Sequence, residues 1–232
     1  MSPEPTPADL VQAIYAKRFA GIEARRNQVW RVICRIAFQK WIPTGAAVLD
    51  LGGGYGEFIN NIRAETRYLV DLNPESRQRA QTGVRVLTGT LQQFEPELSG
   101  KLDVIFSSNF LEHLPSKDVL LETVRCCRRI LSPSGRLILM GPNIRLLASE
   151  HWDFLDHHLP LSDRTIEELL KVTGFRVLHQ RARFLPYTFR ARLPSHPALV
   201  AAYLRFPLAQ ALLGRQFFFV AEKATSEEGP TP

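Results

Sequence analysis

A glycine-rich turn behind an acidic residue is the first pattern in the chain that could do chemistry. Asp50 lies near the end of the apolar run AAVLDL, and four glycines follow it: Gly52, Gly53, Gly54 and Gly56. Glycines allow positive φ and let a ligand approach the backbone closely. A helix that begins at about Glu57 would add free N–H donors for a negative group. The pattern predicts a ligand-binding strand–turn–helix unit, and a plain tight turn is the alternative.

A second acidic residue narrows the kind of ligand. Asp71 lies at the end of the next apolar run, RYLVDL. An acidic side chain at this place can accept hydrogen bonds from both hydroxyls of a ribose. The two runs together predict a cofactor that contains a nucleoside. Asp71 alone suits a nicotinamide dinucleotide as well as S-adenosylmethionine (SAM).

The segment VLDLGGGYGEF, residues 48–58, resembles the class I SAM-dependent methyltransferases of the type 11/12 kind. The resemblance covers about residues 45–223 and depends on landmarks that follow one another in the family's order. It implies that Asp50 and the glycine turn hold the methionine end of SAM and that Asp71 binds the ribose.

The third landmark is TGTLQQF, residues 88–94. The family often has an Asp here that meets the adenine amino group, and this chain has Thr90 instead. The resemblance therefore assigns the adenine contact to Thr90 or to the backbone of Leu91, with an ordinary loop as the alternative.

The fourth landmark is NFLEHLP, residues 109–115, which is similar to a stretch of many small-molecule methyltransferases. The resemblance implies that Asn109 adjoins the cofactor and that Glu112 and His113 lie near the mouth of the pocket. The ubiquinone-biosynthesis O-methyltransferases have a similar stretch, and resemblance to them suggests a metal site at Glu112 and His113. That pattern has a further Glu where this chain has Asn109, so we expect no metal ligands and a hydrogen-bonding role for Glu112 at a helix start. The predicted cofactor-binding residues are Asp50, Gly52, Gly53, Gly54, Gly56, Asp71, Leu72, Thr90, Leu91 and Asn109.

A long segment after the fifth apolar run, residues 140–162, is rich in histidine, aspartate and aromatic residues. Long connections in compact domains are often functional. Histidine titrates near neutral pH and suits a general base that takes a proton from a hydroxyl or amine. We predict His157, His158 and His113 as catalytic residues. The alternative is that these side chains order the loop through local hydrogen bonds.

The stretches PNIR, WDFLDHH and FLPYT are similar to those of a bacterial subgroup associated with polysaccharide or lipid-linked glycan gene clusters. This resemblance implies a sugar or polyprenyl-linked acceptor. We therefore predict an enzyme that transfers a methyl group from SAM to a hydroxyl or amine of a small molecule or glycolipid.

Three rival functions remain. The formal net charge of +6 suggests a nucleic-acid (RNA) methyltransferase, although the fourth run ends in SSNF and lacks the Asn/Asp-Pro-Pro-aromatic signature of exocyclic-amine methylases. A non-catalytic partner protein of the same fold and a nicotinamide oxidoreductase are the others. The intact glycine turn and Asp71 argue against a non-catalytic protein.

The elements that must position these residues alternate along the chain. Short apolar runs at 46–51, 67–71, 84–87, 102–107 and 135–140 are separated by helical or loop stretches. This alternation predicts an α/β fold, a Rossmann-like doubly wound sheet of seven strands. We expect a mostly parallel sheet with one antiparallel strand near the C-terminus, N-terminal helices, and a helical insertion before the last strand. We also expect helices at 118–131 and 163–173 and a turn at Ser132–Gly135.

The predicted domains are an N-terminal helical cap over residues 1–44 and a SAM-binding domain over residues 45–223, followed by a disordered tail over residues 224–232. The insertion, residues 185–215, alternates arginines with aromatic and aliphatic residues. It is either an amphipathic membrane-surface element or a lid or dimer contact. The basic N-terminal helix, with Arg25 and Arg26, either closes the pocket over an anionic substrate or presents a solvated face.

The remaining features place the protein in the cytoplasm, with peripheral membrane contact through residues 185–215 as an option. No apolar run reaches the roughly 18 residues that a membrane span needs, and the N-terminus does not resemble a secretory signal. The three cysteines have no metal or redox spacing. The oligomeric state and the acceptor atom stay open.

Overall fold

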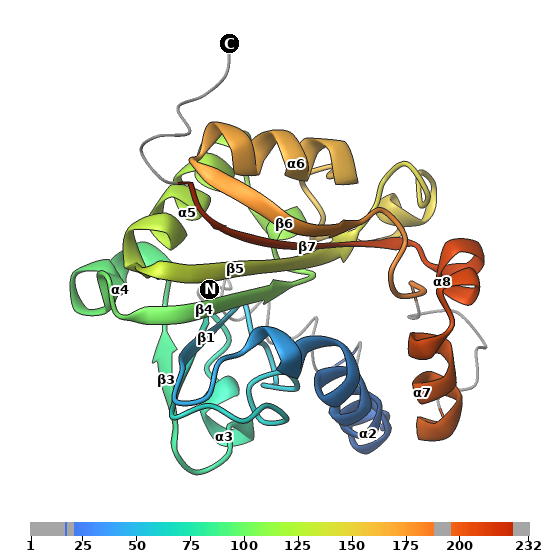
Figure 1. The fold of residues 1–232 in the computed structure, drawn as a ribbon, viewed down its shortest axis with the longest axis horizontal. Helices are drawn as coiled ribbons and strands as arrows, with labels where there is room; N and C mark the ends of the chain where they lie inside the picture. Colours follow the sequence, from blue (N-terminus) through green and yellow to red (C-terminus); the bar gives the residue numbers. More distant parts are fainter. Residues whose placement is uncertain (1–16, 18–20, 188–195, 225–232) are drawn as a thin grey trace, which may run out of the picture.

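A seven-stranded sheet forms the centre of the fold in the computed structural model, which describes residues 17, 21–187 and 196–224 (Figure 1). The strand order is β3-β2-β1-β4-β5-β7-β6. Neighbours among the first five strands pair in parallel, and β7 pairs antiparallel with both β5 and β6. The predicted fold class, a mostly parallel doubly wound sheet with one antiparallel strand near the C-terminus, is confirmed.

Strands and helices alternate along most of the chain. The strands are β1 (Ala47–Leu51), β2 (Thr66–Asp71), β3 (Val84–Thr88), β4 (Leu102–Ser108), β5 (Leu131–Pro142), β6 (Phe175–Arg181) and β7 (Gln216–Lys223). The helices are α2 (Glu23–Ile33), α3 (Ser76–Arg79), α4 (Leu91–Leu98), α5 (Lys117–Ile130), α6 (Asp163–Val172), α7 (Pro197–Arg205) and α8 (Pro207–Leu213). Four short helical segments complete the list: η1 (Cys34–Phe38), η2 (Gln39–Trp41), η3 (Leu111–His113) and η4 (Glu150–Asp153).

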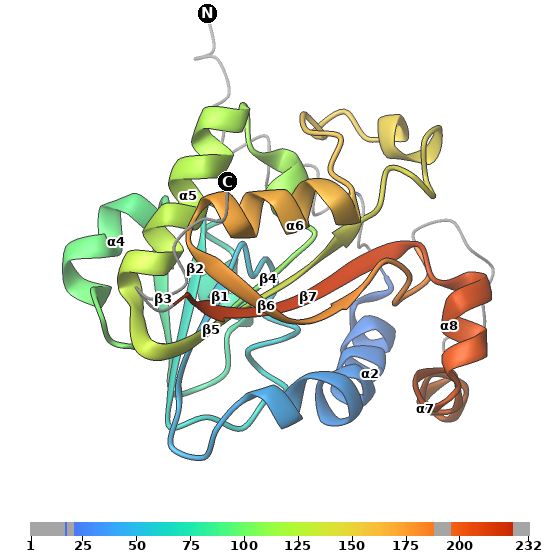
Figure 2. The ribbon, with the colours of Figure 1, turned by 45° about the horizontal axis from the view of Figure 1, so that its top comes forward.

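Two hydrophobic clusters lie on the two faces of the sheet, because successive side chains of a strand point to opposite faces. Leu49 and Leu51 of β1 belong to the cluster beneath α4, α5 and α6, whereas Val48 belongs to the cluster beneath η1 and α7. Figure 2 shows α5 and α6 on one side of the sheet and α2 and α7 on the other. Both faces of the central strands are therefore buried, as a parallel sheet requires.

The helix expected to begin at about Glu57 is not present, and this prediction is wrong. Consecutive turns fill the connection between β1 and β2, where the Asn60 N–H donates to the Gly56 carbonyl and the Asn61 N–H to the Phe58 carbonyl. Gly56 has φ +75°, outside the helical range. The glycine that makes the turn thus also keeps a regular helix from starting there.

The turn expected at Ser132–Gly135 is also wrong, since the structure includes these residues in β5. The pairing with β4 shifts register here: Leu102 pairs with Leu131, but Val104 pairs with Arg136. A Cβ on Gly135 would lie 2.9 Å from the Leu102 carbonyl oxygen. Because glycine has no Cβ, the irregular stretch can lie close to β4 and continue the strand.

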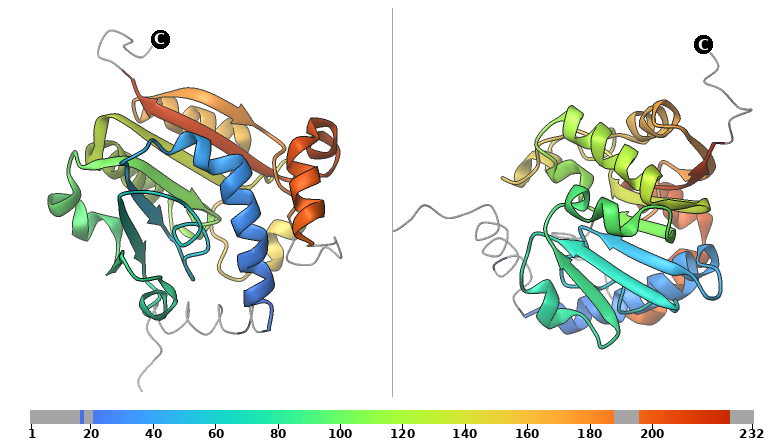
Figure 3. Two further views of the ribbon diagram at one scale, coloured as in Figure 1. Left: turned by 60° about the horizontal axis from the view of Figure 1, so that its bottom comes forward. Right: turned by 90° about the vertical axis from the view of Figure 1, so that its left-hand side faces the viewer.

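The N-terminal and inserted helices lie on the same side of the sheet, where α2 packs beside α7 (Figure 3). Gly21 has φ +74° and lies in the turn before α2. Of the predicted disordered tail, residues 224–232, only Ala224 is described, and its N–H donates to the Gly174 carbonyl; the rest lies outside the described residues. The domain boundaries stay predictions. Within the described part of the chain, every helix is too short or too polar to cross a bilayer.

Candidate active site

An open cleft lies beyond the carboxyl ends of β1 and β4. The strand order reverses between these two strands, and open α/β sheets bind their ligands at such a point. The lining residues are Arg26, Trp30, Asp50, Gly52, Gly53, Gly54, Glu57, Phe58, Phe106, Ser108, Asn109, Glu112, His113, His157 and Tyr187.

The glycine turn reaches the cleft with its backbone. Gly52 has φ +67° and Gly54 has φ +53°. A Cβ on Gly52 would lie 2.4 Å from ring atoms of Phe110, and one on Gly53 would lie 2.8 Å from the carboxyl carbon of Asp50. Side chains at these positions would be both strained and crowded, so the sequence must place glycines here.

Two buried carboxylates hold the turn in shape. Asp50 accepts the Ile59 N–H at 3.3 Å, and Asp71 accepts the Gly54 and Asn73 N–H groups, each at 2.7 Å. Burial raises the pKa of Asp50 well above its usual value and also raises the pKa of Asp71, while the hydrogen bonds to each partly offset the effect. A cationic ligand beside Asp50 would favour its charged form.

The cleft brings together five of the ten predicted cofactor residues: Asp50, Gly52, Gly53, Gly54 and Asn109. Asn109 has φ +50°, the one positive φ among the described non-glycine residues. Strained backbone of this kind gathers at functional sites. The turn that follows β4 is therefore shaped to present Asn109 and the residues after it to the cleft.

The other five predicted residues lie outside the cleft lining: Gly56, Asp71, Leu72, Thr90 and Leu91. Asp71 contacts the lining indirectly, because it accepts the N–H of Gly54, which lines the cleft. Thr90 precedes α4 and forms a capping box with Gln93, Leu72 is exposed, and Leu91 is buried in the core. Their predicted roles toward the ribose and adenine stay predictions.

The charges and rings of the cleft fit SAM, which carries a sulfonium and an ammonium group. Three carboxylates (Asp50, Glu57 and Glu112) line the cleft, against one arginine. Phe58 and Phe106 stack with ring centroids 3.7 Å apart beside the turn. Cations are attracted to carboxylates and to aromatic faces. The predicted cofactor thus matches the chemistry of the lining.

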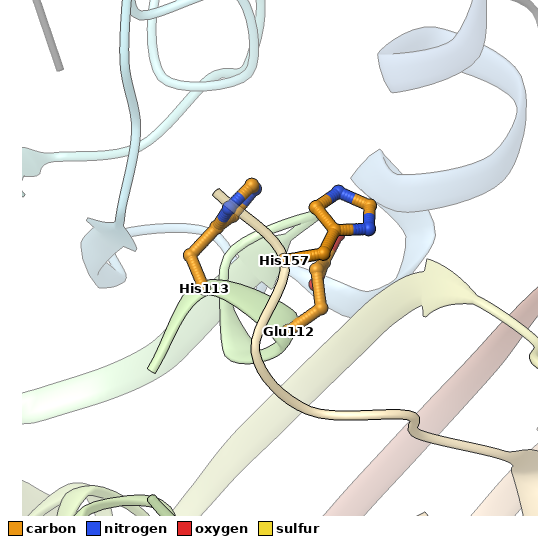
Figure 4. Close-up of side chains that lie close together, drawn as sticks. All are labelled: Glu112, His113 and His157. Carbon is orange, nitrogen blue, oxygen red and sulfur yellow. The ribbon is translucent and has the colours of Figure 1, made fainter. Parts of the chain in front are cut away.

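Glu112, His113 and His157 line the cleft, and Figure 4 shows their side chains gathered close together. One ligand-type atom from each of Glu112, His113 and His157 lies within 4.8 Å of the other two. The His157 ring centroid is 4.8 Å from that of His113 and 4.6 Å from that of His151. Burial, and then the nearby His113, lower the pKa of His151, so that its neutral form is favoured. Two of the three predicted catalytic residues, His113 and His157, are therefore side by side.

The loop after β5 is tied to η3 by its backbone. The N–H groups of His158 and Leu159 both donate to the Glu112 carbonyl, at 2.8 and 3.0 Å. His113 Nδ1 lies 2.7 Å from the Asp156 carbonyl oxygen and must donate its proton there, since a carbonyl oxygen only accepts. The third predicted catalytic residue, His158, is exposed and outside the cleft lining.

Two aromatic residues complete the cleft, and neither was among the predicted site residues. Trp30 follows Arg26 by one helical turn on α2, and Tyr187 comes from the segment after β6. Arg26 itself lies in the cleft and donates to Glu57 at 2.9 Å. The spacing of Arg26 and Trp30 is the signal that could have located Trp30, because residues four apart share a helix face.

Comparison with known proteins gives a family match. The methyltransferase domain family matches residues 22–180. No protein of curated function matches the chain by sequence. The fold is similar to a SAM-dependent methyltransferase from Archaeoglobus fulgidus, with 21% identity, coverage of 91% of this chain and 98% of that chain, and a TM-score of 0.62.

Two further solved structures have the same fold. One is the Haloferax volcanii complex between the Trm112 methyltransferase activator and a methyltransferase, with 18% identity, coverage of 92% and 97%, and a TM-score of 0.65. The other is the Burkholderia thailandensis 1,6-didemethyltoxoflavin-N1-methyltransferase with bound 1,6-didemethyltoxoflavin and S-adenosylhomocysteine, with 17% identity, coverage of 94% and 86%, and a TM-score of 0.57.

Proposed function

This chain belongs to the methyltransferase domain family and uses SAM as its cofactor, and from that premise we propose that it methylates a hydroxyl group of a small molecule bound in the cleft. The observation that carries the proposal is the proximity of His113 and His157 to the glycine turn in one cleft. An amine acceptor would use the same cleft but would need less help in losing its proton.

The residues of the cleft have separate roles in the proposed reaction. Bound SAM supplies an electrophilic methyl group, which the acceptor oxygen takes as its proton leaves. The glycine turn and Asp50 hold the methionine end in line with the acceptor, since positioning is a large part of such catalysis. Glu57 and Arg26 form an ion pair at the cleft edge, at 2.9 Å. Trp30 and Tyr187 cover the acceptor side and exclude water.

His113 is oriented to accept the proton. Its Nδ1–H donates to the Asp156 carbonyl, so in the neutral ring Nε2 carries the free lone pair. A histidine held in one tautomer by a backbone carbonyl is a well-prepared general base. His157 is the second candidate because its ring lies against that of His113. His158 stays a weaker candidate, since its side chain is exposed.

A sugar or polyprenyl-linked acceptor is the finer proposal, and its support comes from the inserted helices. Apolar side chains of α7 and α8 are exposed, namely Leu199, Leu208, Leu212 and Leu213, with Phe206 between the helices. Arg205 and Arg215 are exposed beside them. Apolar side chains flanked by arginines suit an anionic membrane surface. Contact there would bring the cleft to a lipid-linked acceptor.

The test measures S-adenosylhomocysteine release with a panel of acceptors. The panel holds monosaccharides, nucleotide sugars, a polyprenyl phosphate sugar and total RNA, and mass spectrometry identifies any product that has gained a methyl group. We expect turnover with a hydroxyl-bearing small molecule or glycolipid. Turnover with RNA alone would contradict the proposal, and so would a chain that binds SAM but methylates none of these acceptors.

A further inference from the structure

The spacing of Glu112, His113 and His157 is close to that of ligands around one metal ion. Their ligand-type atoms all lie within 4.8 Å of one another. Two nitrogen or oxygen ligands about 2.1 Å from one ion stand at most about 4.2 Å apart. Tetrahedral ligands at that distance stand roughly 3.4 Å apart, so side-chain rotations that move the ligand atoms by about 1 Å would close the site. Figure 4 shows the three side chains gathered in one place, two from η3 and one from the loop after β5.

The backbone fixes these three side chains in relation to one another. The Glu112 carbonyl accepts the N–H groups of His158 and Leu159, which holds the segment carrying His157 against η3. The Asp156 carbonyl accepts the Nδ1 proton of His113, which leaves Nε2 as the ligand atom. Metal-binding histidines almost always donate their other N–H to a carbonyl or carboxylate in this way.

The surroundings also suit a cation. Glu112 is 1% exposed and His157 is 7% exposed, so a bound ion would meet a carboxylate and an imidazole already out of water. His151 is fully buried against His157, and within the described part of the chain neither of its ring nitrogens makes a hydrogen bond of ordinary geometry. His151 is therefore a candidate for a fourth ligand.

We propose that Glu112, His113 and His157 bind a divalent transition-metal ion at the acceptor end of the cleft. Two imidazoles and one carboxylate are typical ligands of zinc, iron, cobalt, nickel or manganese ions, and imidazole is a poor ligand for magnesium or calcium. The sequence pattern lacked a third ligand because Asn109 stands where a Glu was needed. The loop after β5 supplies it as His157, 44 residues beyond His113 along the chain.

The ion gives the proposed methylation a way to activate the acceptor, so this inference rests on the proposed function. Three protein ligands leave positions open toward the cleft, and an acceptor hydroxyl bound at one of them loses its proton more readily. The proton passes to water, the oxygen forms a bond to the methyl carbon, and the carbon–sulfur bond of SAM breaks to leave S-adenosylhomocysteine. The histidines then act as ligands, and the ion replaces them as the group that acidifies the hydroxyl.

The experiment uses cobalt(II) as the probe. The chain is purified without a histidine tag, stripped with a chelator and titrated with Co²⁺, and the visible absorption of Co²⁺ bound to nitrogen ligands is recorded. We expect one ion per chain, with at least tenfold weaker binding in Glu112→Gln and in His157→Asn. His158→Asn is the matched control, because the neighbouring imidazole is exposed and should leave Co²⁺ binding unchanged. His113→Asn replaces any variant whose circular dichroism differs from that of the parent chain.

Other results separate this proposal from the proposed function. Absence of a Co²⁺ band, or equal binding in all variants, overturns the metal site. SAM binding and methylation that persist in the stripped chain, with no change on adding zinc, cobalt or manganese, overturn the ion's role but leave the methyltransferase standing. Co²⁺ binding that follows the variants supports the metal site even where no acceptor of the panel is methylated.

Discussion

Asp71 accepts two backbone N–H groups with its carboxylate, and its predicted second role is to bind the ribose of SAM. Asp71→Ala should weaken SAM binding at least tenfold, since a hydrogen bond to a charged group contributes about 1.5–3 kcal/mol. Calorimetric titration with SAM measures the change. Asp71→Asn is the control, as it keeps one oxygen acceptor and should bind more tightly than the alanine variant. Affinity equal to that of the parent chain in Asp71→Ala would refute the assignment.

Asp50 links stability to pH through its buried carboxyl group. Burial raises its folded-state pKa above the unfolded value, so the folded state holds the proton more tightly. Its contribution to the unfolding free energy is then fully present below the unfolded pKa, near 4, and is lost as the pH rises through the folded pKa.

Asp50→Asn removes the loss of unfolding free energy that the Asp50 carboxyl group causes as the pH rises. Without SAM, the variant should be more stable than the parent at pH 7 by roughly 0.5–2 kcal/mol, with a smaller gain at pH 5. Asparagine can still accept the Ile59 N–H, so the turn keeps that hydrogen bond. Thermal unfolding at the two pH values measures the gain, and calorimetry should show weaker SAM binding. A lower melting temperature at both pH values would contradict this account.

The histidines of the cleft can be ranked by single substitutions. His113→Ala and His157→Ala should lower kcat by roughly 10²–10⁴-fold, the usual contribution of a general base, while SAM affinity stays within a few fold. His158→Ala should change kcat less, because its side chain is exposed. Steady-state kinetics with the identified acceptor decides the order. Near-normal turnover in both His157→Ala and His158→Ala would rule out a base in this loop.

At the scale of elements, the connection between β1 and β2 depends on its glycines for two separable reasons. Gly52→Ala combines a positive φ with a Cβ only 2.4 Å from Phe110, whereas Gly45→Ala has φ +77° and nothing within 4 Å. Overpacking adds about 1–3 kcal/mol to the backbone strain of about 1–2 kcal/mol. Gly52→Ala should therefore destabilise the chain more in urea unfolding and abolish SAM binding, while Gly45→Ala should keep it. Equal losses in both variants would remove the argument from crowding.

Apolar periodicity was enough to predict most of the elements. The five parallel strands, α5 and α6 lie close to their predicted ranges, because buried strands and amphipathic helices have distinct patterns. The helix at Glu57 and the turn at Ser132–Gly135 were wrong for one shared reason. In both places the conformation of a glycine is set by contact with a neighbouring strand or side chain. The local sequence does not reveal that neighbour.

The candidate site was only partly predictable for a related reason. The glycine turn and NFLEHLP lie at strand ends, where the fold alone brings them together. His157 meets Glu112 through two backbone hydrogen bonds of a long loop, and Trp30 arrives on a helix from far earlier in the chain. Contacts of this kind depend on tertiary packing, which residue types and spacing do not encode.

At the scale of the whole molecule, the exposed apolar side of α8 offers a direct test of membrane contact. Leu208 and Leu212 are 79% and 78% exposed. Each buried leucine contributes roughly 1.5–3 kcal/mol, so the double variant Leu208→Glu/Leu212→Glu should bind anionic vesicles at least tenfold more weakly than the parent chain. Vesicle co-sedimentation measures binding. The matched control is Leu178→Glu, an exposed position on β6 away from α8, which should bind vesicles normally.

Failure of the parent chain to sediment with vesicles would contradict membrane contact, and so would equal binding by the double variant. Either result would favour the other interpretation of residues 185–215, a lid over the cleft or a contact between copies of the chain. Size-exclusion chromatography of the double variant would then distinguish these two.

The packing of α2 beside α7 has a consequence for the newly synthesised chain. A ribosome adds about 5–20 residues per second, so α2 emerges many seconds before the helix that it packs against. The part of the cleft wall that α2 forms lacks its packing against α7 until residues 197–205 have left the exit tunnel. Nascent chains that stop before residue 197 should therefore lack a finished acceptor pocket, even though the strands that carry the glycine turn have already been made. The support that α7 gives to α2 is therefore added only after the strands that carry the glycine turn have been made.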